Sequence, residues 1–239
     1  MNIRESTVTH ERVRLNYRMT KFRKLVGAAA ALAAMTAPFG APGIAQAVTP
    51  SVLGGGSGIV VGGQNICTLT TIGRDSGSRL VGFTAGHCGA AGAAIVPEND
   101  RDAGTVGTVV SAGSDLDYAV IEFDPAKVTP VNQVGGTTIT GLGGPARPPD
   151  TVCKEGRTTG RTCGPAYGDM FTGGNSTWTQ TCVVEGDSGA PLVVGTTLVG
   201  MVSGYLAVPC LGPQLGTDIT AVVADVNARG GPGAGFQPI

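Results

Sequence analysis

Short apolar runs rich in β-branched residues recur along the chain and alternate with clusters of Gly, Asn and Asp. Runs of this length, separated by turn residues, indicate β-strands that form a barrel or a sandwich. A loop rich in Gly and Pro at residues 141–150 interrupts the series, so we place the boundary between two β-barrels near residue 140. The predicted strands cover residues 66–72, 79–84, 105–110 and 118–123 before this loop and residues 178–182, 191–194 and 197–202 after it.

The pattern changes near the C-terminal end. Ile219, Val222, Val223 and Val226 follow helical spacing and the pattern stops before Gly230, which predicts one short helix over residues 219–228. The chain has 40 glycines among its 239 residues, and glycine weakens helix interiors while serving tight turns. The sequence therefore predicts an all-β class with a short C-terminal helix.

The first 47 residues have a different composition. Four basic residues within positions 18–24 lead into an apolar run at 25–35 and then to the small-residue site Ala45-Gln46-Ala47. This is the pattern of a secretory signal peptide, cleaved after Ala47. The apolar run is about half of the roughly 20 residues that a spanning helix needs, so a retained membrane anchor is the weaker interpretation. Met19 is an alternative to Met1 as the start of translation.

Removal of this leader changes the charge balance. The leader carries seven of the 16 Lys and Arg residues but only two of the 17 Asp and Glu residues, so the remainder has a net charge of −6. An acidic chain argues against nucleic acid or an anionic membrane as a partner, and solubility explains the charge without any binding role. We expect a secreted, extracellular monomer.

All six cysteines lie after the leader. An even number of cysteines in an exported chain indicates disulfides before metal or redox chemistry. A zinc site would need closely spaced Cys or His residues, whereas these cysteines are spread out, and we expect no metal or cofactor. The six are Cys67, Cys88, Cys153, Cys163, Cys182 and Cys210.

A glycine-flanked serine, Ser188, lies between two predicted strands in the segment GDSGAP at residues 186–191. A serine hydroxyl is a poor nucleophile at neutral pH and needs a base, a group to orient that base and donors for the developing oxyanion. The N–H groups of Gly186 and Ser188 are the candidate donors. Taken alone, this motif is also compatible with an ordinary turn.

The candidate base has little competition, because His87 is the only histidine outside the leader, which carries His10. His87 follows a predicted strand and precedes Cys88, so its position is fixed, as a general base requires. Asp117 and Asp115 compete as the carboxylate that orients it. We favour Asp117 because it begins an apolar strand, where burial would hold it against the imidazole.

The order His, Asp, Ser along the chain separates families, because α/β-hydrolases run Ser, acid, His and subtilisins run Asp, His, Ser. Residues 84–88, 117–120 and 186–191 resemble the three signature blocks of the chymotrypsin family. Residues 152–160, with Cys163 and with Cys182 six positions before the serine, resemble the bacterial branch of streptogrisins and the α-lytic endopeptidase. The resemblance spans roughly residues 58–226.

This resemblance implies a serine endopeptidase that acts on proteins or peptides through an acyl-enzyme. It implies two six-stranded antiparallel β-barrels, residues 48–140 and residues 141–239 including the helix, with the active site in the cleft between them. His87 and Asp117 would come from the first barrel and Ser188 from the second. The implied disulfides are Cys67–Cys88, Cys153–Cys163 and Cys182–Cys210, out of 15 possible pairings.

The chain departs from the bacterial pattern in lacking a long pro-region, since only some ten residues separate the leader from the first strand. In that branch a basic residue in the loop of the second disulfide pairs with the aspartate before the serine. Lys154 matches this position, with Arg157 as second choice, and would hold Asp187 so that the oxyanion hole forms without a further cleavage.

Specificity follows least clearly from the sequence. By resemblance, Ser203, Gly204 and Tyr205 form the strand that pairs with the substrate backbone. Tyr205 stands where relatives have a small residue and would crowd the primary pocket. Cys182 occupies the spacing of the aspartate in trypsin-like pockets, while Asp218 is a candidate for the pocket floor, so small apolar and basic side chains both stay open.

An alternative function of a different class also fits the sequence. The chain would then be an exported binding module on a protease-like scaffold, with its cleft closed by Tyr205. The presence of all three triad residues favours the enzyme.

Overall fold

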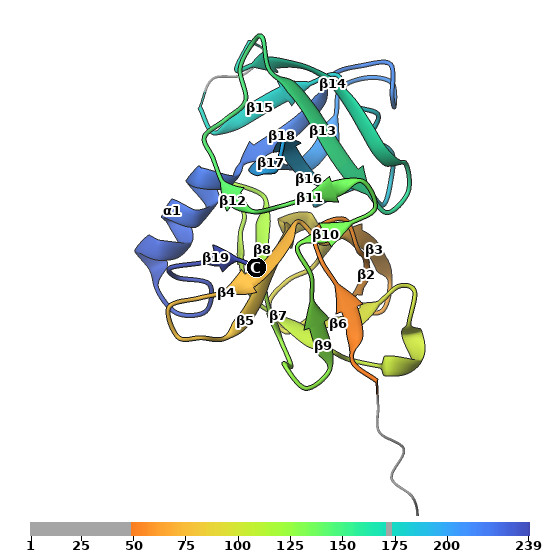
Figure 1. Ribbon diagram of the computed structural model, residues 1–239, viewed down its shortest axis with the longest axis vertical. Helices are drawn as coiled ribbons and strands as arrows, with labels where there is room; N and C mark the ends of the chain where they lie inside the picture. The colour runs from red at the N-terminus through yellow and green to blue at the C-terminus, as the bar shows by residue number, and fades with distance from the viewer. Residues whose placement is uncertain (1–48, 171–173) are drawn as a thin grey trace, which may run out of the picture. The chain divides into compact units, whose positions relative to one another are not determined.

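Two large β-sheets carry most of the chain in the computed structural model, which describes residues 49–170 and 174–239 (Figure 1). The predicted signal peptide, residues 1–47, lies outside the described residues. One α-helix, α1 (Ile219–Arg229), follows the last strand of the second sheet, where the sequence predicts it. No helix in the described part of the chain is long and apolar enough to cross a membrane.

The first sheet has eight strands in the order β19-β4-β5-β8-β7-β6-β2-β3. Only Leu69 and Thr70 separate β3, at one edge of the sheet, from β4 near the other edge, so the sheet must curl. Its strands are β2 (Gly58–Val61), β3 (Asn65–Thr68), β4 (Thr71–Arg74), β5 (Leu80–Ala85), β6 (Ala94–Pro97), β7 (Gly107–Gly113), β8 (Tyr118–Phe123) and β19 (Gln237–Pro238).

The second sheet closes into a six-stranded barrel, because β17 pairs with both β16 and β18. A seventh strand, β12, adds in parallel to the barrel strand β17. The strands are β12 (Gly141–Leu142), β13 (Thr151–Gly156), β14 (Gly160–Gly168), β15 (Ser176–Thr179), β16 (Pro191–Val194), β17 (Thr197–Tyr205) and β18 (Gln214–Asp218).

The predicted all-β class with a short C-terminal helix is confirmed, with one difference in the first sheet. We expected two six-stranded barrels; the first sheet has eight strands, and in the described chain no ladder joins its two edges. The reason is that β19, from the end of the chain, occupies the outer edge of β4. The first sheet is therefore a curled half-barrel beside a closed barrel.

Two short pairs of strands and two 3₁₀ turns complete the regular structure. β1 runs parallel to β9, and β10 runs antiparallel to β11 just before the chain enters the second sheet. Their bounds are β1 (Ser51–Leu53), β9 (Val128–Pro130), β10 (Gln133–Val134), β11 (Thr137–Thr138), η1 (Gly86–Cys88) and η2 (Arg101–Ala103).

One apolar cluster belongs to both sheets. Phe83 and Val120 from the first sheet pack in the same buried group as Leu198 and Met201 from the second and Val222 from the helix. Burial of apolar surface is the main favourable contribution to folding, so this shared cluster fixes one sheet against the other. It also fixes the strand ends that carry the candidate catalytic residues.

The end of the chain returns to the first sheet after α1. The Phe236 ring packs edge-on against Phe83, with 4.9 Å between ring centroids, and the Gly233 N–H donates to the buried carboxylate of Asp75 at 3.0 Å. Asp218, a sequence candidate for the pocket floor, caps α1, because its carboxylate accepts the Thr220 N–H at 2.9 Å.

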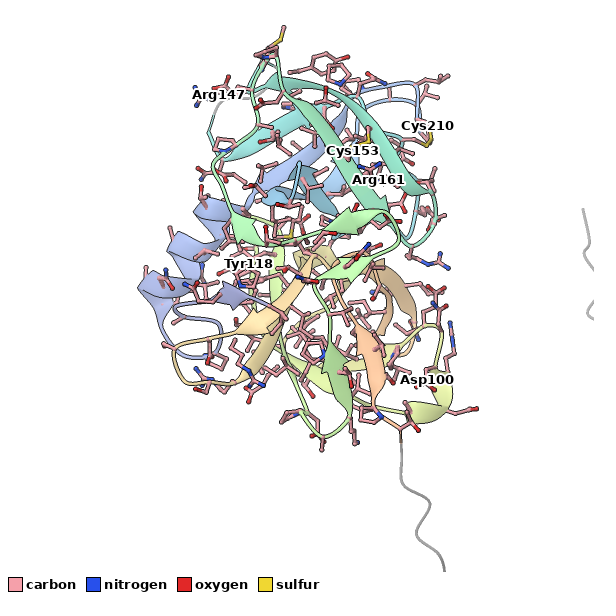
Figure 2. The ribbon with its side chains drawn as sticks, viewed as in Figure 1. Asp100, Tyr118, Arg147, Cys153, Arg161 and Cys210 are labelled. Carbon is pink, nitrogen blue, oxygen red and sulfur yellow. A yellow bond between two sulfur atoms is a disulfide. The ribbon has the colours of Figure 1, made fainter. Side chains whose placement is uncertain are left out.

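The three disulfides are the pairs that the resemblance implies. Cys67–Cys88 joins β3 to η1, and Cys182–Cys210 ties the segment before Ser188 to the loop after β17. Cys153 and Cys163 are directly opposite each other on β13 and β14, and Figure 2 shows Cys153 within the second sheet.

Candidate active site

His87 lies in the 3₁₀ turn that ends β5. The next residue, Cys88, is buried, bonded to Cys67, and its carbonyl accepts the Asn65 side-chain amide at 2.8 Å. Gly86 passes so close to β8 that a Cβ there would lie 2.9 Å from the Tyr118 nitrogen, so the close approach requires glycine. The backbone of the turn is thereby fixed, while the imidazole itself is exposed to the cleft.

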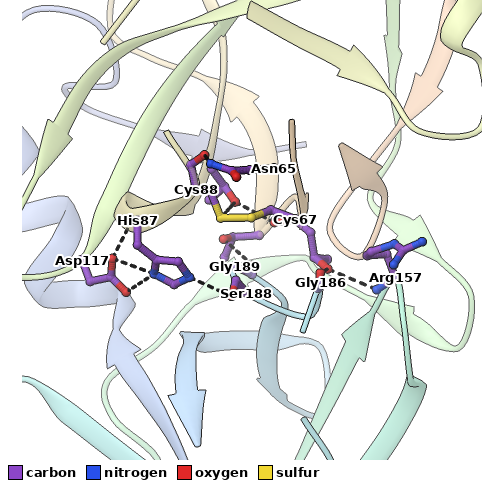
Figure 3. Close-up of a disulfide and its surroundings, with 12 residues drawn as sticks. Asn65, Cys67, His87, Cys88, Asp117, Arg157, Gly186, Ser188 and Gly189 are labelled. Carbon is purple, nitrogen blue, oxygen red and sulfur yellow. Dashed lines mark hydrogen bonds and ion pairs between the residues drawn. A yellow bond between two sulfur atoms is a disulfide. The ribbon is translucent and has the colours of Figure 1, made fainter. Parts of the chain in front are cut away.

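Asp117 immediately precedes β8 and is oriented toward His87 (Figure 3). Its carboxylate accepts the His87 backbone N–H at 2.8 Å, and the imidazole Nδ1 lies 2.9 Å from Oδ2 and 3.0 Å from Oδ1. The competing candidate, Asp115, hydrogen-bonds Ser114 at 3.3 Å on the surface. The geometry therefore agrees with the choice of Asp117 over Asp115.

Ser188 completes the group, because its Oγ lies 2.8 Å from His87 Nε2 (Figure 3). The serine belongs to the turn that enters β16, whereas His87 and Asp117 belong to the first sheet. The structure thus brings together all three residues that the sequence singles out, from segments separated by up to 101 positions.

The electrostatics of the pair suit an imidazole that accepts a proton. The hydrogen bond that His87 Nδ1 donates to Asp117, together with the charge of that carboxylate, raises the pKa of His87 above its ordinary value despite partial burial. Burial alone would raise the pKa of Asp117, but the hydrogen bonds and charge of His87 outweigh burial and lower it. Asp117 therefore stays ionised beside the imidazole.

The turn around Ser188 leaves two N–H groups free to meet a ligand. The N–H groups of Asp187, Gly189 and Ala190 donate to the carbonyls of Val184, Val202 and Asp187, at 3.1, 2.8 and 2.8 Å respectively. The N–H groups of Gly186 and Ser188 have no acceptor among the described residues. These are the two donors that the sequence predicts for an oxyanion hole.

Asp187 is fully buried beneath this turn, and Lys154, also fully buried, has its Nζ 3.6 Å from Oδ2. Burial lowers the pKa of Lys154, an effect that the charge of Asp187 opposes. The shorter contacts to Asp187 come from the N–H groups of Thr158, Thr159 and Val184, at 3.0, 3.2 and 3.1 Å, and from the Thr159 hydroxyl at 2.7 Å. Lys154 thus lies where the resemblance implies, within a larger cradle.

Arg157, the second choice for holding Asp187, pairs elsewhere. Its Nε donates to Glu98 Oε2 at 2.7 Å, and a second nitrogen contacts the same carboxylate. Thr158 and Thr159 are partners of Asp187 that were not predicted from the sequence. Their position between Gly156 and Gly160, in the same segment as Lys154, is the signal that marks this loop.

Ser203, Gly204 and Tyr205 form the end of β17, paired with β18. The Ser203 hydroxyl lies 2.7 Å from Thr217 Oγ1 and makes a small contribution to lowering the pKa of Asp117. This second role of Ser203 was not foreseen. Tyr205 is 40% exposed, so its ring is in contact with solvent rather than buried in the barrel.

Two open cavities flank His87. One, of about 420 Å³, is lined by Ala112, Gly113 and Asp117, and the other, of about 400 Å³, lies beside Glu185 and Ser188. A peptide passing Ser188 has room on both sides of the imidazole. In the described part of the chain, no group of three or more His, Cys, Asp or Glu side chains is placed to bind a metal ion.

No family model matches the chain. Among solved structures, protease A of Thermobifida fusca is 25% identical with a TM-score of 0.63, and the match covers 79% of this chain and 99% of that one. The chymotrypsin of Cellulomonas bogoriensis is 26% identical with a TM-score of 0.59, at 79% and 99% coverage. A Nocardiopsis protease, 23% identical with a TM-score of 0.61 and 74% and 97% coverage, shares the fold. This chain is thus a structural relative of the bacterial chymotrypsin-like serine proteases.

Proposed function

We propose that this protein is a secreted serine endopeptidase in which Ser188 is the nucleophile, His87 the general base and Asp117 the orienting carboxylate. The proposal depends on one observation, the unbroken series of contacts from Asp117 Oδ2 to His87 Nδ1 at 2.9 Å and from His87 Nε2 to Ser188 Oγ at 2.8 Å. An oriented imidazole is what makes a serine hydroxyl nucleophilic at neutral pH.

The reaction then proceeds in two halves. Ser188 Oγ attacks the peptide carbonyl carbon as its proton passes to His87 Nε2, and the same proton is given to the departing amine, leaving an acyl-enzyme. In the second half, a water molecule attacks the acyl-enzyme as its proton passes to His87 Nε2, and the proton is then given to Ser188 Oγ as the acid product leaves. The N–H groups of Gly186 and Ser188 stabilise the oxyanion in each half, which is usually a large part of the rate enhancement.

Substrate binding uses the end of β17. An extended peptide pairs with the backbone of Ser203, Gly204 and Tyr205, as a strand added to the edge of a sheet. The cavity of about 400 Å³ beside Glu185 and Ser188 accommodates residues of the substrate near the scissile bond. The protein therefore acts on proteins or peptides and requires no cofactor.

Export is part of the proposal. Its support is the signal-peptide pattern of residues 1–47 together with three disulfides, since disulfides persist mainly in oxidising compartments. The working unit is then residues 48–239, with a first barrel-like part to residue 140 and a second from residue 141.

The test compares the protein lacking residues 1–47 with its Ser188→Ala and His87→Ala variants. Each variant should lose most peptide turnover, and the double variant should lose little more, because the triad works as a unit. Ser76→Ala is the matched control, since Ser76 is an exposed serine in the turn between β4 and β5. Unchanged peptide cleavage after Ser188→Ala would show the mechanism to be wrong.

The alternative, an exported binding module with an inactive cleft, makes the opposite prediction for an active-site probe. A phosphonylating reagent should label the parent at Ser188 and leave the Ser188→Ala variant unlabelled. If the parent also stays unlabelled while binding peptides, the binding module is the correct interpretation.

A further inference from the structure

The peptide bond between Glu185 and Gly186 has a conformational choice that the proposed chemistry depends on. In a trans peptide the C=O and the N–H point in opposite directions, so the Gly186 N–H faces the cleft only when the Glu185 carbonyl faces away. Gly186 has a φ of +91°, and a glycine tolerates either orientation of the preceding peptide. Some contact outside the turn must therefore select the orientation.

That contact is made by Thr158. Its hydroxyl donates to the Glu185 carbonyl oxygen at 2.8 Å, and it is placed there because its own N–H donates to Asp187 at 3.0 Å. A Cβ on Gly186 would collide with the Thr158 hydroxyl, so the loop that carries Thr158 is in direct contact with the turn that carries Gly186. Holding the carbonyl in this direction aims the Gly186 N–H the other way.

The proton of the Thr158 hydroxyl is itself directed. Arg157 NH1 donates to Thr158 Oγ1 at 2.9 Å, and a hydroxyl that accepts in this way has its single proton left for the carbonyl of Glu185. Arg157 is held in turn by Glu98, which follows β6 of the first sheet. Hydrogen bonds in such a series polarise one another.

A second threonine supports the other side of the same residue. Thr68, at the end of β3, accepts the Arg157 backbone N–H at 3.1 Å and donates its hydroxyl to the Gly186 carbonyl at 2.8 Å. The carbonyls before and after the Gly186 N–H are thus both fixed by threonine hydroxyls. Neither threonine hydroxyl is hydrogen-bonded to a residue of the triad.

We propose that Thr158 is a positioning residue, which holds the Glu185–Gly186 peptide with its N–H toward the cleft and is itself oriented by the Arg157–Glu98 pair. The inference rests on the proposed function, because it assigns a device to the oxyanion hole of that reaction. It differs from the predicted role of Lys154, which concerns Asp187 rather than this peptide.

The test removes only the hydroxyl. Thr158→Val should lower kcat and kcat/KM together by about 10- to 100-fold, approaching the loss seen when an oxyanion donor is deleted, because the interaction matters only in the transition state. Thr158→Ser keeps a hydroxyl and should stay close to the parent. Thr196→Val is the matched control, since Thr196 is an exposed threonine with one hydroxyl contact, to Thr140 at 2.8 Å.

A pair of inhibitors separates this role from a merely structural one. A peptide aldehyde forms a hemiacetal in which a bond joins Ser188 Oγ to the carbonyl carbon, the π electrons move to the aldehyde oxygen and the hydroxyl proton passes to His87 Nε2. The corresponding peptide alcohol binds without forming an oxyanion. In the Thr158→Val variant, the affinity for the aldehyde should fall by the same factor as kcat/KM. The affinity for the alcohol should equal that of the parent.

The outcomes distinguish failure of the positioning role of Thr158 from failure of the proposed function. Suppose that the parent cleaves peptides. If the Thr158→Val variant cleaves them equally fast, or if it loses affinity for the alcohol and the aldehyde by the same factor, the positioning role is wrong and the proposed function stands. The same conclusion follows if Thr158→Ser is as slow as Thr158→Val. If the parent neither cleaves peptides nor binds the aldehyde, the proposed function itself fails. Thr158 is exposed, and thermal unfolding of each variant checks that it folds.

Discussion

Asp117 holds a left-handed backbone conformation, with φ of +46°, that non-glycine residues seldom adopt. It persists because the carboxylate accepts both the backbone N–H and the imidazole of His87. Such outliers are common where a site needs a side chain aimed in one direction. At the scale of single residues, the conformation of the backbone and the protonation of His87 are therefore linked through one carboxylate.

A pH profile follows from this link. The pKa of His87 is raised above its ordinary value of 6.5, so the neutral, active imidazole is lost as the pH falls through a value above 6.5. The acidic limb of kcat/KM should lie there. Asp117→Asn removes the charge, so the limb should move to lower pH and kcat should fall by about 10⁴-fold. An unchanged limb in that variant would contradict the coupling.

Lys154 supplies a second prediction at this scale. Lys154 and Asp187 are both 0% exposed, and removing one member of a buried pair leaves the other charge without compensation. Lys154→Met should reduce the free energy of unfolding by about 3–5 kcal/mol and lower peptide turnover sharply, as measured by denaturant titration and active-site titration. Arg161→Met, an exposed basic residue on the partner strand, is the control and should change little. If Lys154→Met matches the parent, the hydrogen bonds from Thr158, Thr159 and Val184 suffice to hold Asp187.

The triad residues could be named from the sequence because each is marked by its immediate neighbours: a strand and Cys88 for His87, an apolar run for Asp117, flanking glycines for Ser188. Thr158 could not, because its partner Glu185 lies 27 positions away and nothing local in its loop records that contact. Local patterns reveal local constraints. Contacts between loops that are distant in the sequence are seen only in the folded structure.

At the scale of elements, strands with a continuous apolar pattern could be predicted from the sequence, whereas a strand with buried charged residues could not. β8 and β17 were predicted because their apolar residues fill the core, and both are found. β13 was missed, because Lys154 and Glu155 interrupt its apolar pattern. Both charged residues are buried there in polar contacts, a situation that a hydrophobic pattern does not register.

The contact between β8 and α1 gives a prediction for alkaline pH. The buried Tyr118 hydroxyl donates to Asp225 at 2.5 Å, and burial together with that carboxylate raises the pKa of Tyr118 to about 12. Because the folded pKa is above the ordinary value of 10.0, the contribution to stability is complete below pH 10 and is lost as the pH rises toward 12.

Tyr118→Phe should therefore reduce the free energy of unfolding by about 2 kcal/mol at pH 8, and the difference from the parent should shrink as the pH approaches 12. Denaturant titrations at several pH values measure it. The matched control is Tyr167→Phe, because Tyr167 lies on β14, away from this contact. A difference that stays constant with pH would show that Tyr118 does not ionise in this range.

At the scale of the whole molecule, the last residues of the chain hold the first sheet. β19 pairs with β4, and Phe236 is 2% exposed against Phe83. Sequence patterns did not foresee this return, because a strand of two residues has no periodicity to detect. The same feature explains why the first sheet is a half-barrel.

Phe236→Ala tests the importance of this return. Removing a buried phenylalanine leaves a cavity, and the free energy of unfolding should fall by about 3–5 kcal/mol, with the melting temperature of the whole protein reduced. Ile239→Ala is the control, because Ile239 is 42% exposed. Equal stability of the two variants would mean that the C-terminal tail is dispensable.

The pairing of β19 with β4 also orders events during synthesis. A ribosome makes β4 well before β19, so a growing chain presents an uncovered β4 edge until β19 emerges. An uncovered edge is a template for pairing with other chains. The interval between translation of the two strands is therefore when the β4 edge is most exposed to aggregation.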